Sequence, residues 1–222
     1  MPTLEPQVER AVQRRLQKPP PFTDDDLAQL EGLAVVFPHD LSDLARFPML
    51  RTLRVVGYGG RDLASLTGHP HLSSLSMEFS ALVDVSVVRT LPMIRRLLLP
   101  RNAIEDISAL RSGLPRLREV DLTGNPLSEE SYRTVIPELR QRIEEAAAVS
   151  EEREWQITRR LYAAGVPFDY FRKGGKYFLC RPGLAFTDTP DAGHAEIAPD
   201  ELEAVLRRGA DEVHKLFARG AD

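Results

Sequence analysis

Residues 94–107 read IRRLLLPRNAIEDI, and residues 117–127 read LREVDLTGNPL. Each stretch contains two aliphatic residues separated by one residue, Leu97 with Leu99 and Val120 with Leu122. Side chains two positions apart point to the same side of a β-strand. Both stretches therefore predict a short strand with one buried face, followed by a turn.

The same pattern recurs along the middle of the chain. Five prolines mark it at intervals of 22, 22, 23 and 22 residues: Pro48, Pro70, Pro92, Pro115 and Pro137. Equivalent strand pairs follow the first two of these prolines, at Leu53 with Val55 and at Leu75 with Met77, and a degenerate earlier copy is centred on Leu33 and Val35. A second apolar pair in each copy, such as Leu63 with Leu66, has the i, i+3 spacing of a helical turn. One copy cannot bury both of its apolar faces alone, so the copies must stack.

These residues resemble the leucine-rich-repeat family in its 22-residue form, L-x-x-L-x-L-x-x-N-x-L. Asn102 and Asn125 occupy the asparagine position of that pattern, whereas Tyr58, Ser80 and Pro38 replace it in the other copies. The resemblance implies an α/β solenoid of about five repeats over residues 26–140. Parallel strands then line one face, and helical or 3₁₀ turns line the other.

The segments flanking the repeats predict caps and a separate C-terminal part. Residues 5–17 predict an amphipathic helix, and Thr23 with Asp26 resembles a capping box, so residues 1–25 are expected to form a helical N-terminal cap. Residues 124–140 resemble a repeat-capping segment in which Ser128 caps a helix. Residues 141–222 predict a small α+β extension. We expect one helix over 140–164, a hairpin of 168–171 with 177–180, a loop over 182–198 and one last helix from Pro199.

Composition limits the possible environments and partners. The 222 residues carry a formal net charge of −4, which gives no general attraction to nucleic acid or to anionic membranes. No apolar run is long enough to span a bilayer, and the N-terminal residues do not resemble a signal peptide. Cys180 is the single cysteine, in agreement with a reducing compartment. We therefore expect a cytoplasmic protein, of bacterial type.

The sequence offers weak candidates for chemistry, and we expect no cofactor and no metal site. Cys180 and His194 form the one thiol–imidazole combination, but Cys180 lies in an apolar strand pattern where an inert buried thiol is commoner. The other histidines, His39, His69, His71 and His214, lack the spacing of zinc ligands and are expected in surface loops. The sequence 173–176, KGGK, predicts a tight turn, not a phosphate loop.

The basic and aromatic residues of the hairpin leave a nucleic-acid hypothesis open. Aromatic rings that stack bases and cations that hold phosphate are the usual elements of such a surface. The residues concerned are Phe168, Tyr170, Phe171, Arg172, Lys173, Lys176, Tyr177, Phe178 and Arg181. The acidic balance of the C-terminal part favours a structural role for them. An enzyme built on Cys180 and His194 is the less favoured alternative.

The favoured hypothesis is a non-catalytic intracellular module that binds a protein partner through the concave face of the repeats, with a regulatory or immunity role as a special case. The family resemblance implies binding through this face. An apolar middle with a charged rim is typical of protein interfaces. The predicted site residues are Arg54, Val56, Tyr58, Ser76, Glu78, Arg96, Leu98, Glu119 and Asp121, with Phe79 and Arg101 near the same edge.

Overall fold

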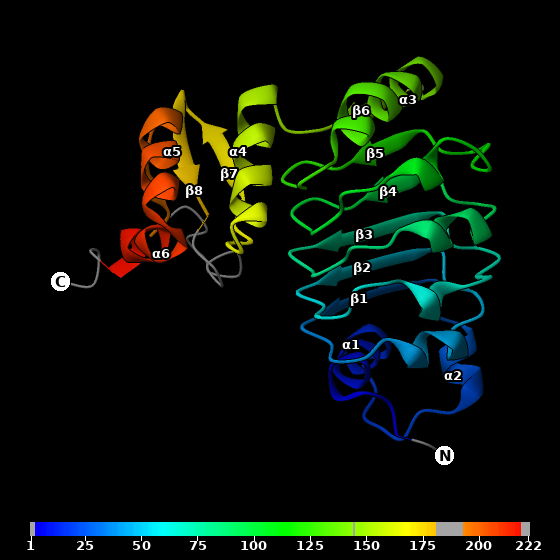
Figure 1. The fold of residues 1–222 in the computed structure, drawn as a ribbon. Coiled ribbons are helices and arrows are strands. Elements are labelled where there is room, and N and C mark those ends of the chain that lie inside the picture. The colour runs from blue at the N-terminus through cyan, green and yellow to red at the C-terminus, as the bar shows by residue number, and fades with distance from the viewer. Residues whose placement is uncertain (1–2, 144, 181–192, 219–222) are drawn as a thin grey trace. The chain divides into compact units, whose positions relative to one another are not determined.

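The structure is a computed structural model that describes residues 3–143, 145–180 and 193–218. The chain forms two compact units: Met1–Leu122 with Ser128–Ala148, called unit 1 here, and Thr123–Leu127 with Val149–Asp222, called unit 2. Figure 1 shows the ribbon of both units, and each is described by itself.

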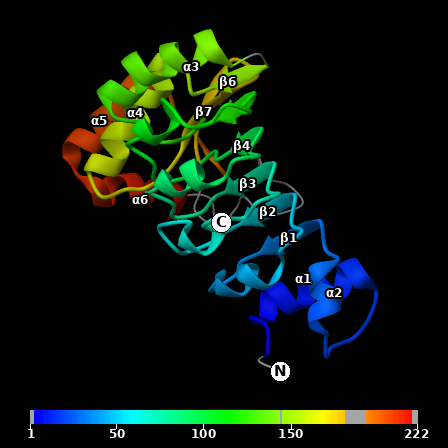
Figure 2. The ribbon, with the colours of Figure 1, turned by 90° about the vertical axis from the view of Figure 1, so that its right-hand side faces the viewer.

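Unit 1 is built around a parallel sheet of six strands that follow one another in chain order. The strands are β1 (Gly32–Val36), β2 (Thr52–Val56), β3 (Ser74–Glu78), β4 (Arg96–Leu98), β5 (Glu119–Asp121) and β6 (Ala146–Ala148). Short 3₁₀ turns return the chain between the strands: η1 (Ser42–Arg46), η2 (Ala64–Leu66), η3 (Ser86–Thr90) and η4 (Ser108–Leu110). In Figure 2 the strands lie one beside the next in chain order, and the first of them, β1, lies beside the N-terminal helices. The predicted α/β solenoid is confirmed.

The core of unit 1 consists of ladders of aliphatic side chains from successive strands. Leu53, Leu75, Leu97 and Val120 pair strand to strand in register, and all four are buried. Burying such side chains contributes about 1.5–3 kcal/mol each. Asn102 is also fully buried, and its amide donates hydrogen bonds to the carbonyls of Met77 (2.8 Å), Leu99 (3.0 Å) and Pro100 (3.1 Å). The amide thereby satisfies backbone oxygens of its own turn and of the neighbouring coil.

Helices flank the sheet. α1 (Pro6–Leu16) packs against β1, and α2 (Asp24–Ala28) begins with the predicted capping box of Thr23 and Asp26. After the repeats, η5 (Ser131–Val135) continues into α3 (Ile136–Arg142), and the Ser128 hydroxyl accepts a hydrogen bond from the Ser131 amide. Val135 and Ile136 are buried, as the amphipathic pattern predicts.

The single helix expected over residues 140–164 is wrong. α3 ends at Arg142, residues 146–148 form β6, and α4 (Glu152–Ala163) begins four residues later. Alanine favours helix, but here the backbone of Ala146–Ala148 pairs with the otherwise open edge of β5. The hydrogen bonds to the backbone N–H and C=O groups at the edge of β5 outweigh the preference of alanine for helix, which amounts to a few tenths of a kcal/mol per residue.

Unit 2 packs α4, α5 (Pro199–Arg208) and α6 (Ala210–Ala218) with an antiparallel sheet of β7 (Tyr170–Lys173), β8 (Lys176–Leu179) and β9 (Ala195–Glu196). The predicted hairpin is confirmed, with Gly174 and Gly175 in the left-handed conformation that a two-residue turn requires. Trp155 anchors α4 by donating from Nε1 to the Leu127 carbonyl at 2.7 Å.

Two other expectations for this part are corrected. The one last helix from Pro199 is two helices, because Gly209 adopts φ +128°, which ends α5. The loop expected over 182–198 contains β9 at its end, where Ala195 pairs with Leu179, and residues 181–192 lie outside the described residues.

Candidate functional site

The strand residues that alternate with the core ladders form the other face of the sheet, which is predicted to be concave and is called the concave face here. Arg54, Ser76, Leu98 and Asp121 are direct neighbours in one cross-strand row. Arg96 and Glu119 are paired in a parallel row, and Val56 lies opposite Glu78. The structure therefore brings together all the predicted site residues except Tyr58 on one strand face.

Tyr58 lies in the turn after β2. Its amide donates to the Ser80 hydroxyl at 3.0 Å, and its ring lies against the backbone of Gly60. Burial, followed by the nearby charges of Asp62 and Asp40, raises the pKa of Tyr58. The half-buried ring is thus part of the turn and not of the strand rows.

Two ion pairs cross the concave face. The Arg54 guanidinium lies 3.8 Å from the Glu78 carboxylate, and Arg96 binds Glu119 on the neighbouring strand. The hydrogen bond that Arg96 donates to the Glu119 carboxylate, followed by the attraction of its negative charge, raises the pKa of Arg96. Exposed pairs of this kind add little stability because water screens them. They do place charges of both signs beside the half-buried side chains of Val56 and Leu98.

The turns that follow the strands share an unusual backbone conformation. Equivalent positions after the first five strands all have positive φ: Phe37 (53°), Gly57 (77°), Phe79 (48°), Arg101 (56°) and Gly124 (72°). A left-handed conformation costs a non-glycine residue about 1–2 kcal/mol. Three coils therefore hold a large side chain where glycine would fit better. The Arg101 guanidinium covers the Phe79 ring at 4.8 Å, and Phe37 remains 44% exposed.

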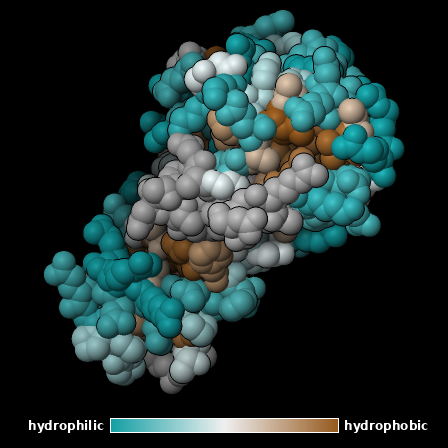
Figure 3. Space-filling model, turned by 90° about the vertical axis from the view of Figure 1, so that its left-hand side faces the viewer, coloured by the Kyte–Doolittle hydropathy of each residue, from teal (hydrophilic) through white to brown (hydrophobic). Residues whose placement is uncertain are grey.

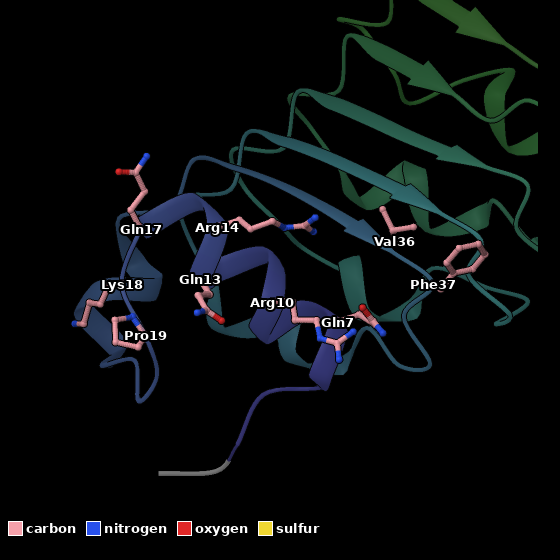
Figure 4. A pocket seen from close by; sticks show the side chains of 9 residues that line it. All are labelled: Gln7, Arg10, Gln13, Arg14, Gln17, Lys18, Pro19, Val36 and Phe37. Atoms are coloured by element: carbon pink, nitrogen blue, oxygen red, sulfur yellow. The ribbon is translucent and has the colours of Figure 1, made fainter. Parts of the chain in front are cut away.

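A groove lies between α1 and the end of β1, and we call it the cap groove (Figure 4). It encloses about 790 Å³ and is lined by Gln7, Arg10, Gln13, Arg14, Gln17, Lys18, Pro19, Val36 and Phe37. Figure 4 shows the Arg14 side chain extending from α1 toward the sheet. Val36 and Phe37 are large apolar side chains left exposed, at 38% and 44%. A hydrophobic area is visible in Figure 3 where the first strands end, beside the N-terminal helices.

Sequence reasoning missed the cap groove because it assigned α1 a purely structural role. The signal that could have found it is the repeat alignment, which places Phe37 on the same turn position as Gly57 and Gly124. A phenylalanine at a position suited to glycine indicates that its side chain has a role that offsets the strain of the backbone.

One expectation about the histidines is wrong. His69 is buried, and its ring nitrogens lie 3.2 Å from the Leu66 carbonyl oxygen and 3.0 Å from that of Leu44. The ring bridges two neighbouring coils, a contact that the repeat spacing creates and that local sequence does not reveal. Over the described residues, no three His, Cys, Asp or Glu side chains lie close enough together to hold a metal ion.

The structure also shows where the residues of the two alternative hypotheses, the Cys/His enzyme and the nucleic-acid binder, lie. Cys180 is buried, and the His194 ring packs edge-on against Phe171 with centroids 5.6 Å apart. In the hairpin, Phe168 and Tyr170 belong to the core of unit 2, and Lys176 pairs with Glu196 at 2.8 Å. Arg181 lies outside the described residues. Core packing and pairing thus engage several groups that a nucleic-acid surface would need.

No protein-family model and no curated protein matches the chain. Among solved structures, an internalin (inlF) from Listeria monocytogenes is similar with a TM-score of 0.52 and 16% identity over 70% of this chain and 53% of that chain. An internalin C2 (inlC2) from the same organism gives a TM-score of 0.49 and 16% identity over 70% of this chain and 80% of that chain. This chain therefore spans about half the length of the first and four-fifths of the second.

The similarity to the inlF internalin is one of fold. It agrees with the parallel sheet and the short return turns, and it supports a leucine-rich-repeat fold. No helix among the residues that the structure describes is long and apolar enough to cross a membrane.

Proposed function

We propose that this leucine-rich-repeat solenoid is a non-catalytic protein-interaction module that binds its partner through the concave face. The supporting observation is the arrangement on that face: Val56 and Leu98 are half-buried, and the Arg54–Glu78 and Arg96–Glu119 pairs lie beside them, joining their strands to the next ones. Aliphatic contacts next to ordered charges combine desolvation with specificity.

The mechanism is rigid docking. The face is made of strands fixed by in-register pairing over fully buried ladders, so its backbone has little freedom to lose on binding. Arg96 is oriented by its hydrogen bonds to Glu119, Arg54 lies near Glu78, and Asp121 adds a negative charge in the Arg54 row. The charges set partner choice and association rate, and Leu98 supplies apolar contact.

We further assign the array to the 22-residue class of the repeat, with residues 124–140 as its capping segment. The strands β2, β3 and β4 start 22 residues apart, at Thr52, Ser74 and Arg96. We place the protein in the bacterial cytoplasm, because its one cysteine is a free buried thiol that agrees with a reducing compartment. A regulatory or immunity role is a special case of this proposal.

The test is partner capture from the native lysate by the immobilised full chain and by an Arg54→Glu/Arg96→Glu variant. Reversing both charges places glutamates beside Glu78 and Glu119, so we expect the captured protein to be lost while the fold is kept. The matched control is Arg61→Glu/Arg116→Glu, the same charge change at two exposed positions outside the strands.

Circular dichroism must show equal folding of the three proteins. Capture by the control and not by the concave-face variant supports the proposal. Capture by the concave-face variant at wild-type level would place the interface elsewhere. Capture that nuclease treatment abolishes would instead support the nucleic-acid hypothesis.

A further inference from the structure

We propose that the cap groove binds an acidic segment of a partner protein that carries one large apolar side chain. This inference goes beyond the concave-face interface, because it concerns a second surface of unit 1 with its own chemistry. Three features of the groove carry it: its charge, its apolar end and its amide side chains.

The charge of the groove is positive and unbalanced. Arg10 and Arg14 lie one helical turn apart on α1, and both line the groove. Neither has an ion-pair partner among residues 3–143, 145–180 and 193–218, whereas Lys18 is bound to Asp26 at 2.6 Å. Like charges at i, i+4 destabilise a helix by a few tenths of a kcal/mol. A carboxylate placed between the two guanidinium groups would remove that repulsion and form charge-assisted hydrogen bonds.

The apolar end of the groove is formed by Val36 and Phe37. They are the large apolar side chains that the described part of the chain leaves most exposed. Phe37 is held at φ +53°, a position that is glycine in two of the other coils, Gly57 and Gly124. A strained backbone that leaves an aromatic side chain partly exposed indicates a use for that side chain. An incoming apolar side chain would bury it.

The remaining lining is neutral and polar. Gln7, Gln13 and Gln17 offer amide groups that can donate to and accept from a peptide backbone. Two unpaired arginines are too few for a nucleic-acid footprint, which takes roughly 6–10 phosphate contacts to reach strong binding. The charge, the apolar end and the amides together fit a short acidic peptide segment.

The probes are three fluorescein-labelled ten-residue peptides of defined composition. The first contains a central phenylalanine flanked by glutamates, the second replaces the phenylalanine by alanine, and the third replaces the glutamates by lysines. Fluorescence anisotropy with the full chain at low ionic strength should show binding of the first peptide, weaker binding of the second and none of the third. Binding of the first should weaken as salt rises.

The chain contains a closely matched pair of variants. Arg14→Glu and Arg15→Glu make the same charge change in the last turn of α1, but Arg14 lines the groove and Arg15 does not. Losing a charge-assisted hydrogen bond should weaken binding of the first peptide by about tenfold or more in Arg14→Glu. Arg15→Glu should keep wild-type affinity, and Phe37→Gly should bind the first and second peptides equally. Arg14→Gln repeats the test if Arg14→Glu unfolds.

Several results would overturn the proposal: no binding of the glutamate–phenylalanine peptide, equal losses in Arg14→Glu and Arg15→Glu, or equal binding of the lysine peptide. Binding to anionic lipid vesicles that depends on Arg14, without peptide binding, would also overturn it in favour of a membrane surface. The concave-face variant Arg54→Glu/Arg96→Glu should bind the peptide normally. A negative result in the lysate capture therefore does not affect the peptide-binding test of the cap groove. A negative result in the peptide-binding test does not affect the capture test of the concave face.

Discussion

Replacing Asn102 by alanine should strongly destabilise the solenoid. The Asn102 amide donates to three backbone carbonyls at 2.8–3.1 Å, and the side chain is fully buried. Two to three lost hydrogen bonds at about 1 kcal/mol each give a decrease of roughly 2–3 kcal/mol in the free energy of unfolding. For a protein of this size, that corresponds to a decrease of about 5–10 °C in Tm.

Two comparison variants sharpen this prediction. Ser80 occupies the same position one coil earlier, and its hydroxyl has two contacts, with the Tyr58 amide at 3.0 Å and the Glu78 carbonyl at 3.2 Å. Ser80→Ala should therefore cost less than Asn102→Ala, about 1–2 kcal/mol. Asn102→Asp keeps the shape but replaces the amide donor by a carboxylate facing carbonyl oxygens. It should cost more than alanine at pH 7.

The assay is urea unfolding followed by far-UV circular dichroism. The fluorescence of Trp155, the single tryptophan, reports unit 2 in the same samples. An Asn102→Ala loss below about 0.5 kcal/mol, within the range of ordinary surface substitutions, would refute the role given to the amide. So would an Asn102→Asp variant as stable as the wild type.

Two further predictions concern buried polar groups. Burial raises the pKa of Glu154, so the folded state holds this proton more tightly than the unfolded state. Glu154→Gln, which can still accept from the Glu151 amide, should therefore increase the stability at neutral pH, and urea titrations should show the gain shrinking as pH falls through the raised pKa. His69→Ala removes the bridge to the Leu44 and Leu66 carbonyls and should cost about 2–3 kcal/mol in urea unfolding. The neighbouring His71→Ala, at a half-buried position, is the control, and equal losses would refute the bridge.

The repeats could be predicted because the same short pattern of apolar residues recurs about every 22 residues. Once Leu97 and Leu99 are placed on a strand, the 22-residue spacing fixes the partner of each residue in the next coil. Ala146–Ala148 carries no such signal, since its strand exists because β5 leaves an edge to pair. Burial of His69 likewise depends on a carbonyl 25 residues away.

One part of the candidate site, the concave face, could be predicted from the sequence, and the other part, the cap groove, could not. Alternation along the strands was enough to place Arg54, Arg96, Leu98 and their neighbours on one face. The cap groove depends on where α1 meets the end of β1, which is a matter of packing between segments. Of its residues, Phe37 alone carried a detectable signal, through its alignment with the glycines of other turns.

The non-glycine residues in the left-handed turns lower the stability of the fold but place large side chains at the ends of the strands. A library of this protein selected for heat resistance alone should drift toward glycine or asparagine at positions 37, 79 and 101, because those residues tolerate the backbone that Phe37, Phe79 and Arg101 adopt under strain. Each such change would also delete a ring or a guanidinium from the rim of the molecule. Substitutions enriched in a stability screen would thus identify the turn positions where the wild-type side chain is not the most stable choice.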